Sequence, residues 1–131
     1  ERAYYSIVVD DTSRSSVIYP ESFLDYKEIN KKVNKKKVEI TLKDYIVNID
    51  KCILNFSIKN NSNEVVNFFN SKLLTNEQGT IENDEGIVLN SKETKEITIE
   101  YDTNYEFPSQ VTLCRGTDKE GEYIDYVIDI K

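Results

Sequence analysis

The sequence contains no histidine, tryptophan or methionine among its 131 residues. Without histidine it cannot form a Ser-His-Asp or Cys-His nucleophilic site, a histidine-ligated zinc centre or an imidazole acid–base catalyst. Its 4 glycines and 2 prolines form neither a Gly-rich phosphate loop nor a long linker. The nucleophile motifs GxSxG and SxxK are absent as well. We therefore expect that the protein is not an enzyme and has no catalytic residues, no metal ligands and no cofactor.

Long hydrophobic runs are also missing. None approaches the roughly 20 residues that a transmembrane helix needs, so we expect no membrane-spanning helix in the sequence shown. The first residue is Glu1 and not methionine, and we expect that a signal peptide, lipid anchor or membrane helix precedes it in the full-length protein. A trimmed cytosolic protein is the alternative.

Basic residues are outnumbered by acidic ones. Lysine and arginine total 17 against 24 aspartates and glutamates, which gives a formal net charge of −7. This sign is wrong for a general nucleic-acid binder, so we expect no nucleic-acid partner. Acidic side chains gather in two loops, but neither loop has the DxDxDG order of an EF-hand, which favours solvated loops over a calcium site. These residues are Glu77, Glu82, Asp84, Glu85, Asp118, Glu120 and Glu122.

The sequence has two cysteines, Cys52 and Cys114, whose spacing fits no CxxC metal or redox motif. In a strand, Cys52 would share the apolar face of Leu54 and Phe56 and point inward. Cys114 would lie opposite the apolar face of its own segment. This difference favours two free thiols over a disulfide, which needs both Cβ atoms within a few ångströms.

Most of the chain alternates apolar and polar residues, and clusters of Asn, Asp, Gly and Ser interrupt the alternation, a pattern typical of antiparallel β proteins. About seven short strands at regular intervals predict an all-β sandwich of two sheets. Between Val38 and Val47 the phase slips near Lys43 and Asp44, which predicts a β-bulge. The clearest strand is the last one, where one face carries Ile124, Tyr126, Ile128 and Ile130.

Residues 1–35 have a different pattern, and we expect them to form an N-terminal extension to a sandwich that covers residues 36–131. An extended opening covers Ala3 to Val9. After Pro20, apolar residues recur at spacings of three and four, which predicts a short helix. The residues of this apolar stripe are Phe23, Tyr26, Ile29 and Val33.

Turn sequences from residue 36 onward carry a family resemblance. They are Ile58-Lys59-Asn60-Asn61-Ser62, Leu73 to Gly79, and Leu89 to Lys95, with Lys92 at a loop position where a glycine is expected. In these features the chain resembles the immunoglobulin-like domains of unknown function in surface lipoproteins of Gram-positive bacteria. The resemblance implies the fold and an extracytoplasmic, cell-surface location, and it implies no ligand.

A second resemblance covers Tyr26 to Asn60, where a polar stretch precedes two long segments of alternating residues. This part is similar to the extracytoplasmic portions of certain membrane-bound anti-sigma factors. It implies that the protein is the sensory domain of a membrane-anchored signalling protein, as an alternative to the lipoprotein module.

Two surface patches are candidate sites. A lysine cluster could contact anionic headgroups or an anionic wall polymer, and its alternative interpretation is a solvated segment. Tyr4 and Tyr123 are expected to point outward, and with Val127 they could form an exposed aromatic patch such as those with which carbohydrate-binding modules stack sugars. Filling of the core or of an edge is the alternative for these tyrosines. The lysine cluster consists of Lys31, Lys32, Lys35, Lys36 and Lys37.

Together these observations predict a non-catalytic binding or interaction module outside the cytoplasm. Its expected partner is a protein or a cell-envelope component. The alternatives are the sensory domain and a carbohydrate-binding module. The sequence leaves the oligomeric state open.

Overall fold

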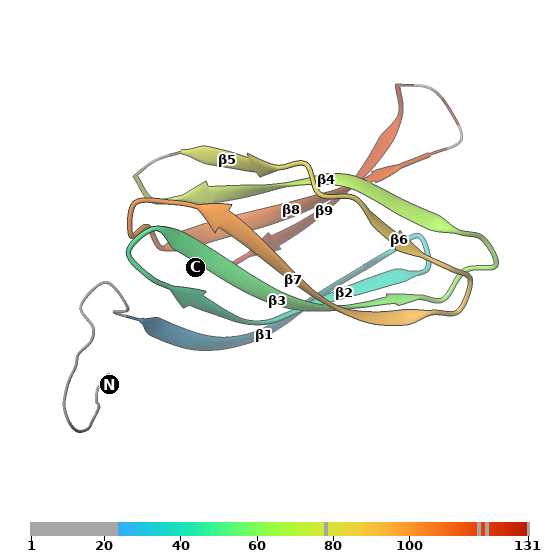
Figure 1. Ribbon diagram of the computed structural model, residues 1–131. Helices are drawn as coiled ribbons and strands as arrows, with labels where there is room; N and C mark the ends of the chain where they lie inside the picture. The colour runs from blue at the N-terminus through green and yellow to red at the C-terminus, as the bar shows by residue number, and fades with distance from the viewer. Residues whose placement is uncertain (1–23, 78, 118, 120, 131) are drawn as a thin grey trace, which may run out of the picture.

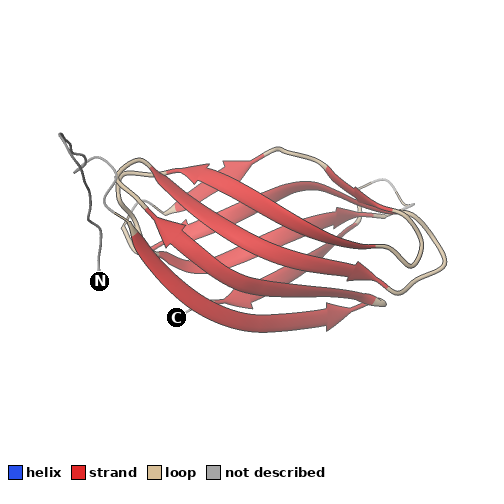
Figure 2. Cartoon of the chain, turned by 60° about the horizontal axis from the view of Figure 1, so that its bottom comes forward, coloured by secondary structure: helices blue, strands red, loops and turns tan. Residues whose placement is uncertain are grey.

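The computed structural model describes residues 24–77, 79–117, 119 and 121–130. This part of the chain contains nine strands and no helix (Figure 2). The strands are β1 (Asp25–Lys35), β2 (Val38–Val47), β3 (Lys51–Asn60), β4 (Val66–Thr75), β5 (Thr80–Asn83), β6 (Ile87–Leu89), β7 (Thr94–Asp102), β8 (Pro108–Gly116) and β9 (Tyr123–Asp129).

The strands form two antiparallel sheets that pack face to face (Figure 1). Sheet A has the order β1-β2-β3-β7. Sheet B has the order β5-β4-β8-β9, and β6 pairs with β4 beside β5. This arrangement confirms the predicted immunoglobulin-like β-sandwich.

One core lies between the sheets, because alternate residues of each strand point inward. The prediction for the last strand is confirmed: Tyr126 and Ile128 are buried, whereas Tyr123 and Val127 are exposed. Cys52 lies in this core, as its phase predicted. The largest buried aromatic side chains are Phe56, Phe68, Tyr101 and Tyr126.

A hydrogen bond joins the two sheets through the core. The Tyr101 hydroxyl on β7 donates to Ser71 Oγ on β4 over 2.7 Å, and both residues are buried. Burial raises the pKa of Tyr101 well above its usual value, so the hydroxyl keeps its proton and stays a donor.

The bulge predicted near Lys43 is present. The pairing of β2 with β3 shifts between Leu42 and Asp44. Because the bulge adds one residue, Tyr45 and Val47 return to the core face that Leu42 occupies.

The helix predicted after Pro20 is wrong over residues 25–35, which form strand β1 along β2. Ile29 and Val33 are four residues apart, a spacing that suits one face of a helix and equally one face of a strand. Both pack against the core, whereas Tyr26 lies on the opposite face. The predicted boundary at residue 36 falls in the turn of the β1–β2 hairpin. The opening strand over Ala3 to Val9 lies outside the described residues.

Two loops hold lysines in the left-handed backbone region. Lys36 (φ 51°) and Lys37 (φ 65°) form the two-residue turn between β1 and β2, and positive φ at both positions is the geometry of a type I′ hairpin. Lys92 has φ 64° at the loop position where the family resemblance expects a glycine. Its Nζ donates to the Asn61 carbonyl over 2.8 Å.

Asn60 connects three segments at one end of the sandwich. Its buried Nδ2 donates to the carbonyls of Glu64 (2.8 Å) and Asn90 (3.0 Å). Its Oδ1 accepts from the Oγ (2.6 Å) and the amide (3.0 Å) of Ser62. The predicted polar turn after β3 is therefore a structural junction.

Side chains bridge both seams between the sheets. At the seam of β1 and β9, Lys31 Nζ donates to the Asp129 carbonyl (2.9 Å) and Lys35 Nζ donates to the Asp125 carbonyl (2.7 Å). At the opposite seam, Asn83 of β5 donates to the carbonyl of Glu100 on β7 (2.7 Å). There Lys95 of β7 also donates to the carbonyl of Val88 on β6 (2.7 Å).

Candidate functional site

The outer face of sheet A is covered by a polar network that crosses all four strands. Tyr26 Oη on β1 donates to Asp44 Oδ2 on β2 over 3.0 Å, and Asn55 Nδ2 on β3 donates to the other oxygen of the same carboxylate over 2.7 Å. Thr98 Oγ1 on β7 then donates to Asn55 Oδ1 over 2.7 Å. The Asp44 hydrogen bond raises the pKa of Tyr26. These groups satisfy one another within the face.

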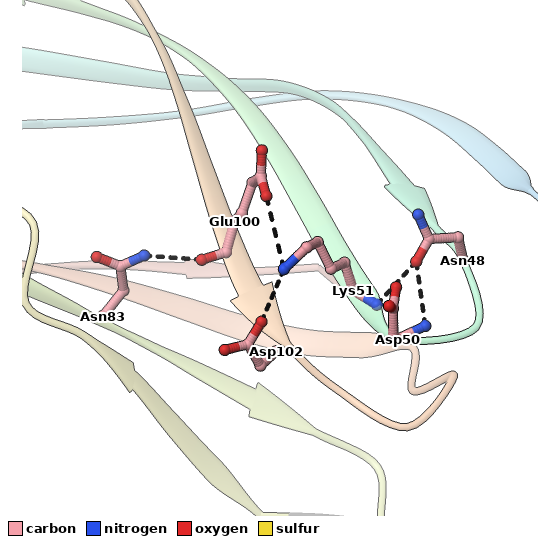
Figure 3. A network of polar contacts seen from close by, with 6 residues as sticks. All are labelled: Asn48, Asp50, Lys51, Asn83, Glu100 and Asp102. Atoms are coloured by element: carbon pink, nitrogen blue, oxygen red, sulfur yellow. Dashed lines mark hydrogen bonds and ion pairs between the residues drawn. The ribbon is translucent and has the colours of Figure 1, made fainter.

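Ion pairs continue this network. Lys51 Nζ lies 2.8 Å from Asp102 Oδ1 and 3.8 Å from Glu100 Oε1, and the Asp102 hydrogen bond raises the pKa of Lys51 (Figure 3). Lys43 donates to Glu96 on the neighbouring part of the face. This hydrogen bond is the main cause of the lowered pKa of Glu96, and a hydrogen bond to Ser57 adds to it. The polar side chains on the outer face of sheet A therefore bond mainly to one another.

The outer face of sheet B also carries polar residues, among them Lys72, Thr112 and Asp125, but most of the exposed apolar side chains lie there, and we call these apolar residues the apolar face. In each strand its residues alternate with buried core residues, and they account for five of the nine large hydrophobic side chains exposed in the described part of the chain. On sheet A, Tyr26 is the exposed hydrophobic residue of the outer face, and its hydroxyl is engaged. The apolar face consists of Phe69, Leu74, Val88, Tyr123 and Val127.

Phe69 and Tyr123 form an aromatic pair on the apolar face. Their ring centroids are 4.9 Å apart with the planes tilted by 48°, although 42% of Phe69 and 62% of Tyr123 remain exposed. Strand β8 lies between the two parent strands, and the residue that pairs with Tyr123 is Gly116. Because Gly116 has no side chain, the two rings can meet above β8.

Sequence reasoning found one half of this pair. The alternation of β9 predicted an outward Tyr123 with Val127 on the same face, and both are exposed. Phe69 was missed, because a register shift between Phe68 and Asn70 adds a residue that no turn signal marks. Tyr4, the other predicted tyrosine, lies outside the described residues.

Cys114 lies on the outer side of β8, as its phase predicted, between Asn70 and Asp125 of the neighbouring strands, yet it is only 5% exposed. Both cysteines are free thiols. Burial raises the pKa of Cys114, and the Asp125 carboxylate that accepts its hydrogen bond raises it further. Burial raises the pKa of Cys52 to about 12. Neither thiol has the low pKa of a reactive cysteine.

The five predicted lysines all lie on β1 and its turn, and all are exposed. Lys31 and Lys35 bridge the seam to β9, and Lys32 Nζ lies 3.4 Å from Glu39 Oε2. Lys36 and Lys37 form the turn and make no ion pair with any described residue. The cluster is thus partly structural, but only Lys32 has a carboxylate partner within the described segments.

Arg115 on β8 lies under this lysine turn and was not found from the sequence. It is 7% exposed, and its Nη1 donates to the Tyr126 hydroxyl (3.0 Å) and to the Lys36 carbonyl (3.3 Å). A single arginine within an alternating strand gives no signal of burial, because long polar residues are mostly exposed.

Two further classes of site are absent from the described ranges. No group of three or more Cys, Asp or Glu side chains is arranged there to hold a metal ion. No helix in these ranges is long and apolar enough to cross a membrane.

No family model and no curated protein match the sequence. Among solved structures, the fold is similar to the 2.2 Å crystal structure of a conserved hypothetical protein from Bacillus anthracis. The TM-score is 0.54 at 14% sequence identity, and the match covers 82% of this chain and 97% of the other. At this identity, the likeness supports the fold alone.

Proposed function

We propose that the protein is a non-catalytic binding module of a cell-envelope lipoprotein, acts outside the cytoplasm, and holds its partner on the apolar face of sheet B. One observation carries this proposal: five of the nine large hydrophobic side chains exposed in the described part of the chain lie on the outer face of sheet B, whereas hydrogen bonds and ion pairs cross the outer face of sheet A. Exposed apolar patches on a soluble domain mark interaction sites. Aromatic residues are enriched at the centres of such sites.

The absence of histidine from the sequence and the raised pKa values of both thiols support a non-catalytic role. Nucleophilic catalysis needs an activated nucleophile beside a base. Here the buried thiols are held in their protonated form.

Site-specific photocrosslinking tests which face binds. A photoreactive phenylalanine derivative would replace Tyr123 on the apolar face or, as the matched control, the exposed Lys59 on the outer face of sheet A. Expressed from the full-length gene in its own host, the Tyr123 variant should form a discrete adduct on irradiation and the Lys59 variant should not. Equal adducts from both positions, or none from Tyr123, would contradict the proposal.

The aromatic pair favours a second candidate, a carbohydrate-binding module. Sugars stack on exposed aromatic rings, and Phe69 and Tyr123 are exposed rings that lie side by side. The nature of the adduct at position 123 separates the two functions. An adduct that proteases remove indicates a protein partner, and one that glycosidases remove indicates a polysaccharide.

The cell-envelope location rests on the family resemblance and is tested in the reading frame before Glu1. A signal peptide that ends in a lipobox cysteine is the expected result. A membrane helix after a cytoplasmic domain would make the protein a sensory domain instead, and a start codon directly before Glu1 would overturn the extracytoplasmic location.

A further inference from the structure

Arg115 is a buried charge without a counter-charge. The guanidinium is protonated at all physiological pH values, and the side chain is only 7% exposed. Within the described segments no carboxylate lies within ion-pair distance of it, and its two acceptors, the Tyr126 hydroxyl and the Lys36 carbonyl, are neutral. Burying a charge without a counter-charge is strongly unfavourable, and an anion bound at Arg115 would offset this cost.

The contacts of Arg115 fix one edge of the guanidinium. Tyr126, itself fully buried, accepts from Nη1 and donates its own proton to the Lys35 carbonyl over 2.8 Å. The ring of Tyr126 is held edge-on by Phe68, with centroids 5.6 Å apart. The acceptors of Nη1 are therefore themselves immobilised.

The other donors of Arg115 remain available. Nε and Nη2 have no acceptor among the described residues, and neither belongs to the fully buried polar atoms that lack a partner there, so each keeps part of the small exposure of the residue. Two adjacent N–H groups on a planar fork match two oxygens of a phosphate or carboxylate. The guanidinium is thus held through Nη1 and keeps two donors that no described residue uses.

The surroundings add positive charge. Residues 27–37 hold six lysines against one glutamate, although the chain as a whole carries a net charge of −7. The Lys35 ammonium lies 5.9 Å from the centroid of the Tyr126 ring, and Lys36 and Lys37 form the turn above Arg115. Since Lys31 and Lys35 donate to main-chain carbonyls, their charges are not neutralised by these contacts.

The carboxylates of the neighbouring strands are engaged elsewhere. Glu39 on β2 faces Lys32. Asp125 on β9 accepts the hydrogen bond of Cys114 on the outer side of sheet B. Among the described residues, this end of the β1–β9 seam therefore combines an oriented guanidinium with ammonium groups that make no ion pair, which is the chemistry of an oxyanion site.

We propose that Arg115, together with Lys36 and Lys37, binds a phosphate group at the end of the sandwich beneath the β1–β2 turn. The N–H pair of Arg115 accounts for recognition of two phosphate oxygens, and the turn lysines supply charge toward the others. A phosphate group has more oxygens that can face donors than a carboxylate has, which suits a site with three cationic side chains. This site lies at the seam, and it is separate from the apolar face.

Arginine side-chain NMR tests the proposal directly. The sequence has only three arginines, Arg2, Arg14 and Arg115, so their Nε–H signals can be assigned by substitution. Inorganic phosphate added at constant ionic strength should shift the Arg115 signal in a saturable manner, and chloride should not. If the lysines respond to phosphate without a saturable change at Arg115, the proposal is wrong.

Variants sharpen this test. Lys36→Asn and Lys37→Asn keep the turn, because asparagine tolerates positive φ, and the Lys36 carbonyl is main chain. Each should weaken phosphate binding several-fold, and the matched variant Lys59→Asn on sheet A should not change it. Arg115→Lys keeps the charge but loses the fork, and we expect about a tenfold or greater loss. Equal affinity in all four variants would show non-specific attraction and overturn the site.

Two presentations of the phosphate group separate its sources. One is a soluble poly(glycerol phosphate), and the other is a vesicle of phosphatidylglycerol in phosphatidylcholine. Binding of the polymer that depends on Arg115 indicates a polymer-borne phosphodiester, and vesicle binding that depends on Arg115 indicates a lipid headgroup. Binding of either one that survives Arg115→Lys unchanged contradicts the site. Because Tyr123 crosslinking does not involve these residues, the two proposals can fail separately.

Discussion

The two outer faces of the sandwich have the same strand geometry but carry different kinds of side chain. On sheet A, the Asp44 carboxylate, the Asn55 amide and the Thr98 hydroxyl saturate one another across three neighbouring strands. On sheet B, the outer face exposes Phe69, Val127 and Tyr123 to solvent, and Gln110 donates to Asp129 beside them. The difference teaches that alternation alone tells which residues face outward, whereas the hydrogen-bonding capacity of those residues tells whether the face is available to a partner.

Both faces belong to the same sandwich. The largest loss of stability is expected at Asn60, which connects three segments at one end of the sandwich. Asn60→Ala leaves the amide of Ser62 without its acceptor and removes one donor from each of the Glu64 and Asn90 carbonyls, which keep their bonds from Ser62 Oγ and the Glu93 amide. A buried group left unpaired costs about 1–3 kcal/mol and each further lost hydrogen bond about 1 kcal/mol, so we expect the free energy of unfolding to fall by about 3 kcal/mol. Urea denaturation followed by circular dichroism measures it. A loss below about 1 kcal/mol would show that water replaces the side chain.

Removing the hydrogen bond between Tyr101 and Ser71, which joins the two sheets, is expected to cause the next largest loss of stability. Tyr101→Phe leaves Ser71 Oγ buried without its partner, and we expect a loss of about 1–2 kcal/mol. The double variant Tyr101→Phe with Ser71→Ala removes both polar groups and should recover most of this loss. If it does not recover, packing and not the hydrogen bond explains the effect of the single change.

A matched pair of substitutions tests the two faces against each other. Asn55→Ala on sheet A breaks the bonds to Asp44 and Thr98 and should destabilise the protein by about 1 kcal/mol. Phe69→Ser on sheet B removes an exposed ring and should change stability by no more than about 0.5 kcal/mol, while it abolishes the adduct at position 123. Thermal unfolding of both variants gives the comparison. A larger loss for Phe69→Ser would mean that the aromatic pair is structural.

The smallest expected effect is a change in how the stability of the protein depends on pH. The pKa of Glu96 is lowered in the folded state by its hydrogen bond to Lys43, so its carboxylate stabilises the fold above its ordinary pKa of 4.5. This contribution disappears as pH falls from 4.5 through the lowered value. Glu96→Gln should therefore remove a small part of the acid sensitivity measured by urea denaturation at acidic pH. Since the pair is exposed, it should also weaken in high salt, and a salt-independent difference would contradict this account.

Several parts of the fold could be predicted because local patterns are strong there. The strict alternation of β9 fixed its buried face and placed Tyr123 outside, and the phase slip near Lys43 located a bulge. The helix prediction for β1 failed because the four-residue spacing of Ile29 and Val33 fits one face of a helix and one face of a strand equally well. Phe69 could not be predicted to meet Tyr123, since their contact needs a bulge in β4 and a glycine on the intervening strand.

Arg115 illustrates a different limit. Its surroundings combine β8 and β9 with the end of β1 and its turn, whose contacts join residues 79 and 91 positions apart along the chain. No local pattern signals such an environment, because it depends on tertiary pairing. The lysine cluster, by contrast, was visible in the sequence, and the structure assigns two of its members to the seam.

The side chains that bridge the seams bear on how the molecule associates. Unpaired carbonyls along the rim of a sheet invite a strand from another chain, which leads to edge-to-edge aggregation. Lys31 and Lys35 occupy such carbonyls on β9, and Lys95 and Asn83 do so on β6 and β7. An incoming strand would have to displace ammonium groups and an amide before it could pair. These side chains thus oppose the addition of a further strand at the edges of the sheets. Association with other molecules is therefore expected on the broad faces of the sandwich.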